Sequence, residues 1–365
     1  MKSESDLIYK IALSHIKGIG DITAKKLISY CGSAELVFKE SKKSLSSIPN
    51  INKKTLDFVN SEQAFQIAEK EIEFIQKNNI NHLFYTDKNY PNRLKLCIDS
   101  PINIYYKGNI KWNESKFISI VGTRKCSSFG REFTENIVKQ LSDYDVVIVS
   151  GLAFGIDVSA HKSALKNNLK TVAVLAHGLD RIYPSQHASI AKEIVESGAL
   201  LSDYKSRTAS NRQNFPSRNR IVAGLSDATI VVESSKKGGS LITADIAHSY
   251  NRDVFAVPGK PTDKSSEGCN YLIKNHKAIL LENSEDIIKN LNWDVTKVSV
   301  QKNLFTNLTK EEEFILSVLK EKQLHIDELK QQLKWTNSVV AKNLLQMEFK
   351  DIILSLPGKM YKRKM

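Results

Sequence analysis

The chain has 365 residues, of which 41% are hydrophobic and 25% are charged, so it is long enough for two or three globular domains with sizeable cores. Its four cysteines lie far apart with no CxxC pair, which excludes a disulfide framework and a zinc site of the usual spacing. No leader or long apolar run is present, so we expect a cytoplasmic protein without a membrane partner. The formal net charge of +13 favours a polyanionic partner.

Residues 1–85 predict a helical domain, with strand-like residues only at 82–85. Gly18 and Gly20 predict a tight turn before a helix, as in a helix-hairpin-helix or SAM-like unit, whose turn can offer backbone N–H groups to a phosphate. A degenerate second copy of this pattern starts at Ile48. Because such units also serve as plain packing modules, the sequence leaves open whether this domain contacts nucleic acid.

Short β-rich runs alternate with helical segments across residues 86–295, which predicts an α/β domain with a parallel sheet. The expected strands are residues 117–121, 145–149, 171–175, 199–202, 228–232, 253–257 and 278–281. Turn signals follow nearly every one of them. Because ligands bind outside the carboxyl ends of parallel strands, we expect these loops to form one site.

Two of these loops are suited to a close approach by an anion. In the run GTRKCSSFG, Gly122 leaves room for a ligand, Arg124 offers a planar guanidinium and Ser127 offers a hydroxyl. The loop after the second strand keeps large side chains away from its opening through four small residues, Ser150, Gly151, Ala153 and Gly155. We therefore expect both loops to line the site.

An acid and a histidine follow the second loop. Asp157 and His161 lie four residues apart on the expected helix, so they face the same way and can hydrogen-bond. With Ser150 nearby they invite a hydrolase interpretation, but no GxSxG elbow is present. The commoner role of such a pair is to orient a loop, and we prefer that interpretation.

A third loop, in the run KKGGSLITA, leads into another helix. Lys237, Gly239 and Ser240 bring an ammonium group, backbone amides and a hydroxyl to its N-terminus, an arrangement that binds anions. The chain contains neither GxxxxGK[ST] nor GxGxxG after a strand, so we expect no mononucleotide or dinucleotide cofactor. A longer anion that lies across several loops fits better.

The run FPSRNRIVAGLS at residues 215–226 is the most informative part of the chain. Its apolar residues recur at helical spacing, which places Arg218, Asn219 and Arg220 in the first turn of a helix. Cations there oppose the helix macrodipole, so an external anion would stabilise them, and an internal ion pair with Asp or Glu is the alternative. Phe215 beside them offers a ring on which a base can stack.

Seven runs, in this order, resemble the DprA/Smf family of DNA-processing proteins. They are GTRKCSSFG (122–130), SGLAFGIDVSAH (150–161), HGLDRIYPSQH (177–187), FPSRNRIVAGLS (215–226), KKGGSLITA (236–244), VFAVPG (254–259) and GCNYLI (268–273). The resemblance implies an extended Rossmann-like core that binds single-stranded DNA, has no catalytic centre and no cofactor, and helps load the RecA recombinase in natural transformation. A homodimer and contact with single-strand binding protein are further expectations.

Carried onto this chain, the DNA contacts of the family fall on the loops already described. They are Gly122, Arg124, the loop 150–155, Phe215, Arg218, Arg220, Lys237 and Ser240. The chain departs from the family at 203–214, where a basic segment with Lys205, Arg207 and Arg212 replaces a Pro-Pro-Gly turn that the family often carries. We expect this segment to be mobile, and it either adds phosphate contacts or is a solvated loop without a role.

Residues 296–365 predict a connector and a small separate domain. Helices expected at 311–319, 326–333 and 339–347, followed by a hairpin, resemble a winged helix whose third helix presents Lys342 and Asn343. An acidic run at 311–313 weakens any argument for a basic face, so the sequence leaves open whether this domain contacts duplex DNA or protein.

The sequence therefore predicts a binder of single-stranded DNA without sequence preference, and not an enzyme. Two alternatives stay open. A nucleotide N-glycosidic hydrolase of the phosphoribohydrolase type uses a PGGxGT-like loop with a downstream Glu, whereas KKGGSLITAD here has Thr243 and Asp245 but no such Glu. The other alternative is an interaction scaffold whose basic charge is incidental.

Overall fold

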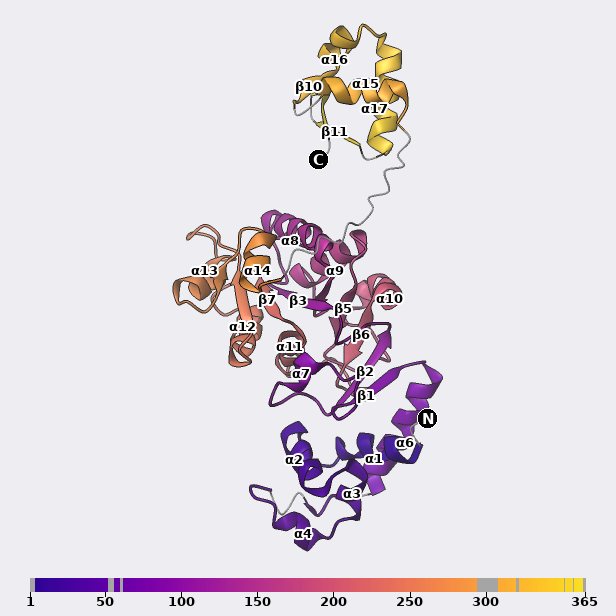
Figure 1. The fold of residues 1–365 in the computed structure, drawn as a ribbon, viewed down its shortest axis with the longest axis vertical. Coiled ribbons are helices and arrows are strands. Elements are labelled where there is room, and N and C mark those ends of the chain that lie inside the picture. Colours follow the sequence, from indigo (N-terminus) through magenta and orange to yellow (C-terminus); the bar gives the residue numbers. More distant parts are fainter. Residues whose placement is uncertain are drawn as a thin grey trace. The chain divides into compact units, whose positions relative to one another are not determined.

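The structure is a computed structural model that describes residues 4–51, 56–59, 62–293, 308–319, 322–350, 352–356 and 358–363. The chain divides into two compact units, Met1–Val298 and Ser299–Met365 (Figure 1). The expected boundary at 295 and 296 lies outside the described residues.

The first unit begins with a group of helices. They are α1 (Glu4–Leu13), α2 (Asp21–Cys31), α3 (Ala34–Lys39), α4 (Lys42–Ser46) and α6 (Glu62–Lys77). Their apolar faces form one core cluster, which also takes in Tyr105 of a sheet strand and Ile102 just before that strand. The helical region expected at 1–85 thus exists, but it shares its core with the following domain.

A sheet of nine strands in the described residues follows, in the order β1-β2-β6-β5-β4-β3-β7-β8-β9. The strands are β1 (Asn81–Phe84), β2 (Asn103–Gly108), β3 (Lys116–Val121), β4 (Val146–Ser150), β5 (Thr171–Val174), β6 (Ala199–Ser202), β7 (Ala228–Val231), β8 (Asp253–Ala256) and β9 (Ile279–Leu280). The strands from β3 to β9 pair in parallel at the expected positions. The predicted Rossmann-like parallel core is thus confirmed, and β2 extends it through antiparallel pairing with both β1 and β6.

Helices cover both faces of this sheet, as a parallel sheet requires because its strands are apolar on both sides. They are α7 (Asn92–Lys95), α8 (Ser128–Leu141), α9 (Ile156–Lys166), α10 (Ala188–Ser197), α11 (Asn214–Leu225), α12 (Gly239–Ser249), α13 (Glu267–Lys274) and α14 (Ser284–Asn290). Consecutive residues of β3 point to opposite faces of the sheet and belong to different core clusters. Phe117 packs in the cluster of α11, and Ile118 packs in the cluster of α8 and α9.

The strand order reverses direction beside β3. From β3 the chain moves outward through β4, β5 and β6, and it then returns to the other side of β3 with β7. In open α/β sheets the crevice outside the carboxyl ends at such a reversal is the usual ligand site. The topology therefore brings together the loops that follow β3, β4 and β7.

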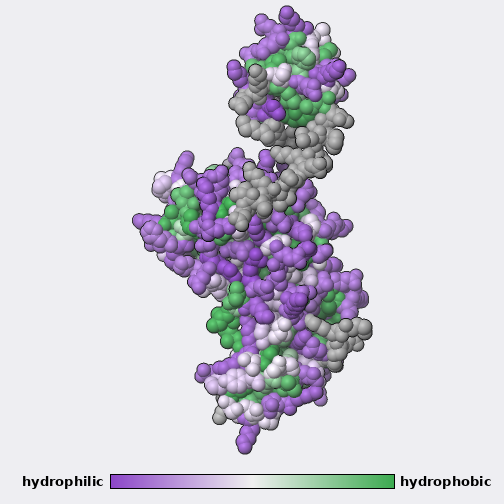
Figure 2. Space-filling model, viewed as in Figure 1, coloured by the Kyte–Doolittle hydropathy of each residue, from purple (hydrophilic) through white to green (hydrophobic). Residues whose placement is uncertain are grey.

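The visible surface is mostly hydrophilic, as the composition implies (Figure 2). Hydrophobic residues gather beside α7, where Leu96 and Ile98 are 81% and 77% exposed.

The second unit is the expected winged helix. It consists of α15 (Lys310–Leu319), β10 (Leu324–His325), α16 (Ile326–Leu333), α17 (Asn337–Phe349), β11 (Ile353–Leu356) and β12 (Met360–Arg363), with its own core. The prediction for Asn343 is wrong, because this residue is buried and its amide donates to the carbonyl of Val339, whereas Lys342 is exposed.

Candidate nucleic-acid interface

The loops beside the strand-order reversal border an open cleft of about 840 Å³. Ten residues that the sequence singled out line it, namely Gly122, Arg124, Gly151, Ala153, Phe215, Arg218, Asn219, Lys237, Gly239 and Ser240. Its cationic side chains are Arg124, Arg212, Arg218 and Lys237, and its one lining carboxylate in the described part of the chain is Asp157. The cleft is therefore strongly biased toward anions.

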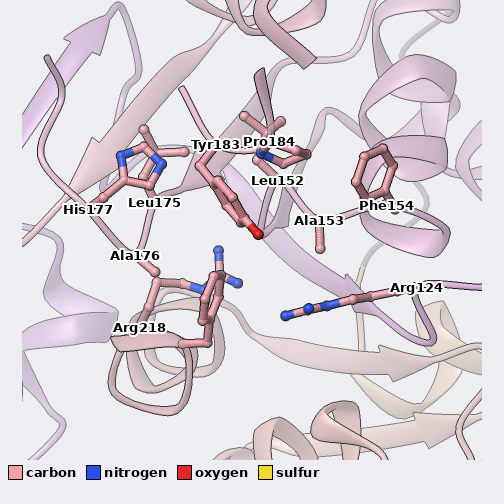
Figure 3. A pocket seen from close by; sticks show the side chains of 11 residues that line it. Arg124, Leu152, Ala153, Phe154, Leu175, Ala176, His177, Tyr183, Pro184 and Arg218 are labelled. Atoms are coloured by element: carbon pink, nitrogen blue, oxygen red, sulfur yellow. The ribbon is translucent and has the colours of Figure 1, made fainter. Parts of the chain in front are cut away.

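Aromatic rings lie within the same cleft. The guanidinium carbon of Arg124 stands 5.2 Å from the ring centroid of Phe215. The ring of Tyr183 lies 6.1 Å from that of Phe215, at an interplanar angle of 55°. Figure 3 shows the Tyr183 phenol and the guanidinium groups of Arg124 and Arg218 pointing toward one another. Positively charged side chains and aromatic rings therefore lie next to each other in this cleft.

Arg218 forms the floor of this region and is only 6% exposed. Its guanidinium donates to the carbonyl of Val174 and, through Nε at 3.3 Å, to the amide oxygen of Asn219. Burial lowers the pKa of this guanidinium below its ordinary value, and the neighbouring Asp157 carboxylate offsets part of that lowering. A Cβ on Gly151 would stand 2.5 Å from both terminal nitrogens of Arg218, so a larger residue there would displace this guanidinium.

Arg220 has the internal role that the sequence left as the alternative. Its guanidinium Nη2 lies 2.7 Å from Asp203 and 3.1 Å from Asp21, and Nη1 donates to the carbonyl of Asp99. It does not line the cleft. The helix also begins earlier than expected, at Asn214, so Arg218, Asn219 and Arg220 lie in its second turn. The prediction that they occupy the first turn is wrong, and the macrodipole argument does not apply to them.

Three further residues from the predicted site have structural roles and do not line the cleft. The Ser127 hydroxyl donates to Glu233 Oε1 at 2.5 Å and caps α8 by accepting from the Gly130 N–H. The buried Ser150 hydroxyl donates to the carbonyl of Ile120. Gly155 precedes α9 with a φ of 79°, a conformation that favours glycine. The two serine hydroxyls thus provide partners for buried polar atoms, the Glu233 carboxylate and the Ile120 carbonyl.

Asp157 and His161 hold the loop between β4 and α9 instead of bonding each other. His161 Nε2 donates to the Gly151 carbonyl at 2.5 Å, and its Nδ1 lies 2.7 Å from the Thr171 hydroxyl. Asp157 accepts from the Ala153 N–H at 3.4 Å. Burial lowers the pKa of His161 to about 4, which keeps the ring neutral. The loop-orienting interpretation is confirmed.

The sequence did not single out Tyr183 or Glu233. Tyr183 lines the cleft and also a small apolar pocket of about 40 Å³ that opens beside Phe215. The run HGLDRIYPSQH contains Tyr183, but nothing local to it predicts that its ring meets Phe215. Glu233 follows β7 and fixes Ser127, so it shapes the first loop from within.

Other classes of site are not evident in the described residues. No group of three or more His, Cys, Asp or Glu side chains could hold a metal ion there. No helix in that part of the chain is long and apolar enough to cross a bilayer.

Comparison with known proteins places this fold and cleft in a family. Residues 81–292 match DNA recombination-mediator protein A, and residues 306–359 match the DprA winged helix domain. The chain is 36% identical to Protein Smf of Synechocystis sp. over 291 residues, which cover 78% of this chain and 72% of that protein. It is 40% identical to DNA processing protein DprA of Streptococcus pneumoniae over 202 residues, 55% of this chain and 71% of that protein.

Solved structures agree. The X-ray structure of DNA processing protein A from Streptococcus pneumoniae aligns with a TM-score of 0.68 and 33% identity, over 77% of this chain and 97% of that one. DNA processing protein A from Helicobacter pylori, described for its single-stranded DNA binding mode, aligns with a TM-score of 0.53 and 29% identity, over 58% and 95%. The chain therefore belongs to the DNA recombination-mediator protein A family, the DprA/Smf family that its motifs resemble.

Proposed function

We propose that this protein binds single-stranded DNA without sequence preference in the cleft beside β3. The observation that carries the proposal is the meeting of four cationic side chains with the rings of Phe215 and Tyr183 in one open cleft. The relative from Helicobacter pylori, whose structure is described for single-stranded DNA binding, supports it.

In this proposal, phosphates and bases use different parts of the cleft. The exposed Arg124, Arg212 and Lys237, with the backbone amides at the start of α12, bind successive phosphates. One base stacks on Phe215, a half-buried residue that lines the cleft. A base in a duplex has both faces covered by its neighbours, so this contact selects an unpaired strand. Stacking and phosphate contacts are common to all bases, which accounts for the lack of sequence preference.

The role of the bound strand follows the family expectation. We propose that the protein protects incoming single strands and loads RecA onto them, acting as a homodimer and exchanging the strand with single-strand binding protein. The test is the rate of RecA filament formation on strands covered by single-strand binding protein, with and without this chain. An unchanged rate contradicts the loading role but does not contradict DNA binding in the cleft.

The decisive experiment for the DNA site is a salt titration of binding to labelled single-stranded and duplex oligonucleotides. We expect tighter binding to the single strand, and we expect Arg124→Ala to weaken all sequences alike and to lower the log–log salt slope by about 0.7, the contribution of one phosphate contact. Arg131→Ala, an exposed arginine outside the cleft, is the matched control and leaves the slope unchanged. Equal slopes for both variants would refute the site.

The hydrolase alternative would need a carboxylate in the cleft, and the one in the KKGGSLITAD run does not lie there. Asp245 forms a surface ion pair with Lys277 at 2.9 Å and does not line the cleft. Asp157, which does line it, accepts from the Ala153 backbone and lies beside Arg218. Base release from nucleoside monophosphates, assayed alongside the titration, is expected at background rate, and a scaffold without DNA affinity would show no binding at about 0.1 M salt.

A further inference from the structure

A second groove, of about 810 Å³, lies between α6 and residues 205–208. Its cations are Lys70, Lys77, Lys205 and Arg207, against the carboxylates of Glu71 and Glu73. In the described part of the chain neither Lys70 nor Lys77 forms an ion pair, so both ammonium groups are available to a ligand. Phe74 adds a half-buried aromatic ring to the lining.

One of the two carboxylates is already used by the protein. Glu71 is 4% exposed, and its carboxylate accepts from the Ser206 N–H at 2.9 Å and from the Ser206 hydroxyl at 2.6 Å. These bonds satisfy the carboxylate internally and hold the 205–208 segment against α6. Only Glu73 therefore offers a free carboxylate to the groove. The four cations outnumber the two carboxylates, so the electrostatic potential in the groove favours anions.

Further hydrogen bonds hold residues 207 and 208, which belong to the longer 203–214 segment. The Arg207 N–H donates to Asp180 at 2.7 Å, and the Gly178 N–H donates to the Thr208 carbonyl at 3.2 Å. Arg207 has a φ of 64°, the left-handed region that a non-glycine residue adopts only when its surroundings hold it there. Its exposed side chain is thus presented on an anchored backbone.

The groove and the cleft are both lined by residues of the same segment. Thr208 lines the groove, and Ser210 and Arg212 line the cleft. One residue separates Thr208 from Ser210, so their Cα atoms are at most about 7 Å apart. The segment therefore carries one cation on the cleft side, Arg212, and one on the groove side, Arg207.

We propose that this groove is a second single-strand site, which binds the phosphates of the nucleotides leaving the cleft and extends the DNA footprint onto the N-terminal helices. The proposal rests on single-stranded DNA binding in the cleft. It places the DNA contact of the helical region on α6 and not at the turn before α2. At that turn the first residue of α2 is Asp21, which pairs with Arg220, and its negative charge disfavours a phosphate at this helix N-terminus.

The test compares a short and a long oligothymidylate, of about 5 and about 20 nucleotides, near the lower end of and beyond the roughly 4 to 16 nucleotides that single-strand-binding folds occupy. The variant Lys70→Ala/Lys77→Ala is expected to lower the salt slope for the long strand by about 1.4, two contacts of about 0.7 each, and to leave the short strand unchanged. Lys42→Ala/Lys43→Ala on α4 removes the same charge outside the groove, and we expect it to change neither slope.

Three results would overturn the proposal in distinguishable ways. Equal slopes for the wild type and the α6 variant on the long strand, with Arg124→Ala still flattening both, refute the groove and leave the cleft intact. Equal losses on both strands place the effect in the cleft or the fold. No binding of either strand by the wild type refutes the proposed function itself. Photo-crosslinking of a long strand to wild-type peptides spanning 67–78 tests the groove without any variant, and its absence also refutes the groove.

Discussion

At the scale of single residues, neighbours in one motif have different roles. Arg218 and Arg220 are two residues apart, yet Arg218 lines the cleft while Arg220 binds Asp203, Asp21 and the Asp99 carbonyl. Removing Arg220 would leave Asp203, whose side chain is 9% exposed, without its cation, and the resulting loss of stability would resemble a loss of DNA contact. Variants that probe binding are therefore best chosen among exposed side chains of the cleft.

The role of Phe215 can be measured by truncating its ring. We expect Phe215→Ala to weaken single-strand binding roughly 5- to 150-fold, because stacking is worth about 1 to 3 kcal/mol per base, without changing the salt slope. Phe129→Ala, which removes a 51% exposed ring outside the cleft, is the control. Fluorescence anisotropy at several salt concentrations measures both the affinity and the salt slope. Unchanged affinity, or a changed salt slope, in Phe215→Ala would contradict the stacking role of this ring.

Buried His161 makes stability depend on pH. Its folded pKa is about 4, below the ordinary 6.5, so between these values the unfolded chain takes up a proton that the folded chain does not. Stability therefore falls as the pH falls from 6.5, by about 2 kcal/mol at pH 5 from this group alone.

Urea unfolding at pH 7 and pH 5 checks this expectation. His161→Gln keeps a hydrogen-bond donor but does not titrate, so its stability should decline less between the two pH values. Burial raises the pKa of Asp157 and of Asp203, which act in the opposite direction, but both carboxylates are present in each protein and cancel in the comparison. Identical declines would show that His161 is not protonated on unfolding in this range.

At the scale of elements, the start of α12 combines an anion-binding geometry with free space. The helix begins at Gly239, and a Cβ there would meet no atom within 4 Å. The protein itself therefore does not require glycine at this position. A ligand backbone that approaches the helix N-terminus would require it.

We expect Gly239→Ala to leave stability unchanged or to raise it by up to about 1 kcal/mol, because alanine is the better helix former. Single-strand affinity should fall about fivefold, the equivalent of one hydrogen bond of roughly 1 kcal/mol. Gly20→Ala, at the start of α2, also adds a methyl group into open space and serves as the control. Unchanged affinity in Gly239→Ala would remove the α12 terminus from the DNA site.

At the scale of the whole molecule, the cleft and the groove both lie within the first compact unit. The winged helix has its own core, and its third helix exposes Leu345 and Phe349 at 54% and 83%. Such apolar exposure on a helix is more typical of a protein contact than of a phosphate contact.

Ending the chain after residue 298 should therefore leave single-strand affinity and salt slope almost unchanged. Binding of the shortened and the full chain to the same long oligonucleotide measures this. A drop in slope of about 0.7 or more would show that the winged helix contributes at least one phosphate contact.

The sequence by itself determined the parallel strands, the loops that follow them and the winged helix, because apolar periodicity and turn residues are local properties. It did not predict β2, whose antiparallel partners are distant in the chain. Tertiary structure alone decided which polar side chains remain free for a ligand. The partners of Arg220 lie 17, 121 and 199 residues away, and Ser127 meets Glu233 across 106 residues. Buried polar groups must find partners wherever the fold brings them, and that choice is invisible in a local pattern.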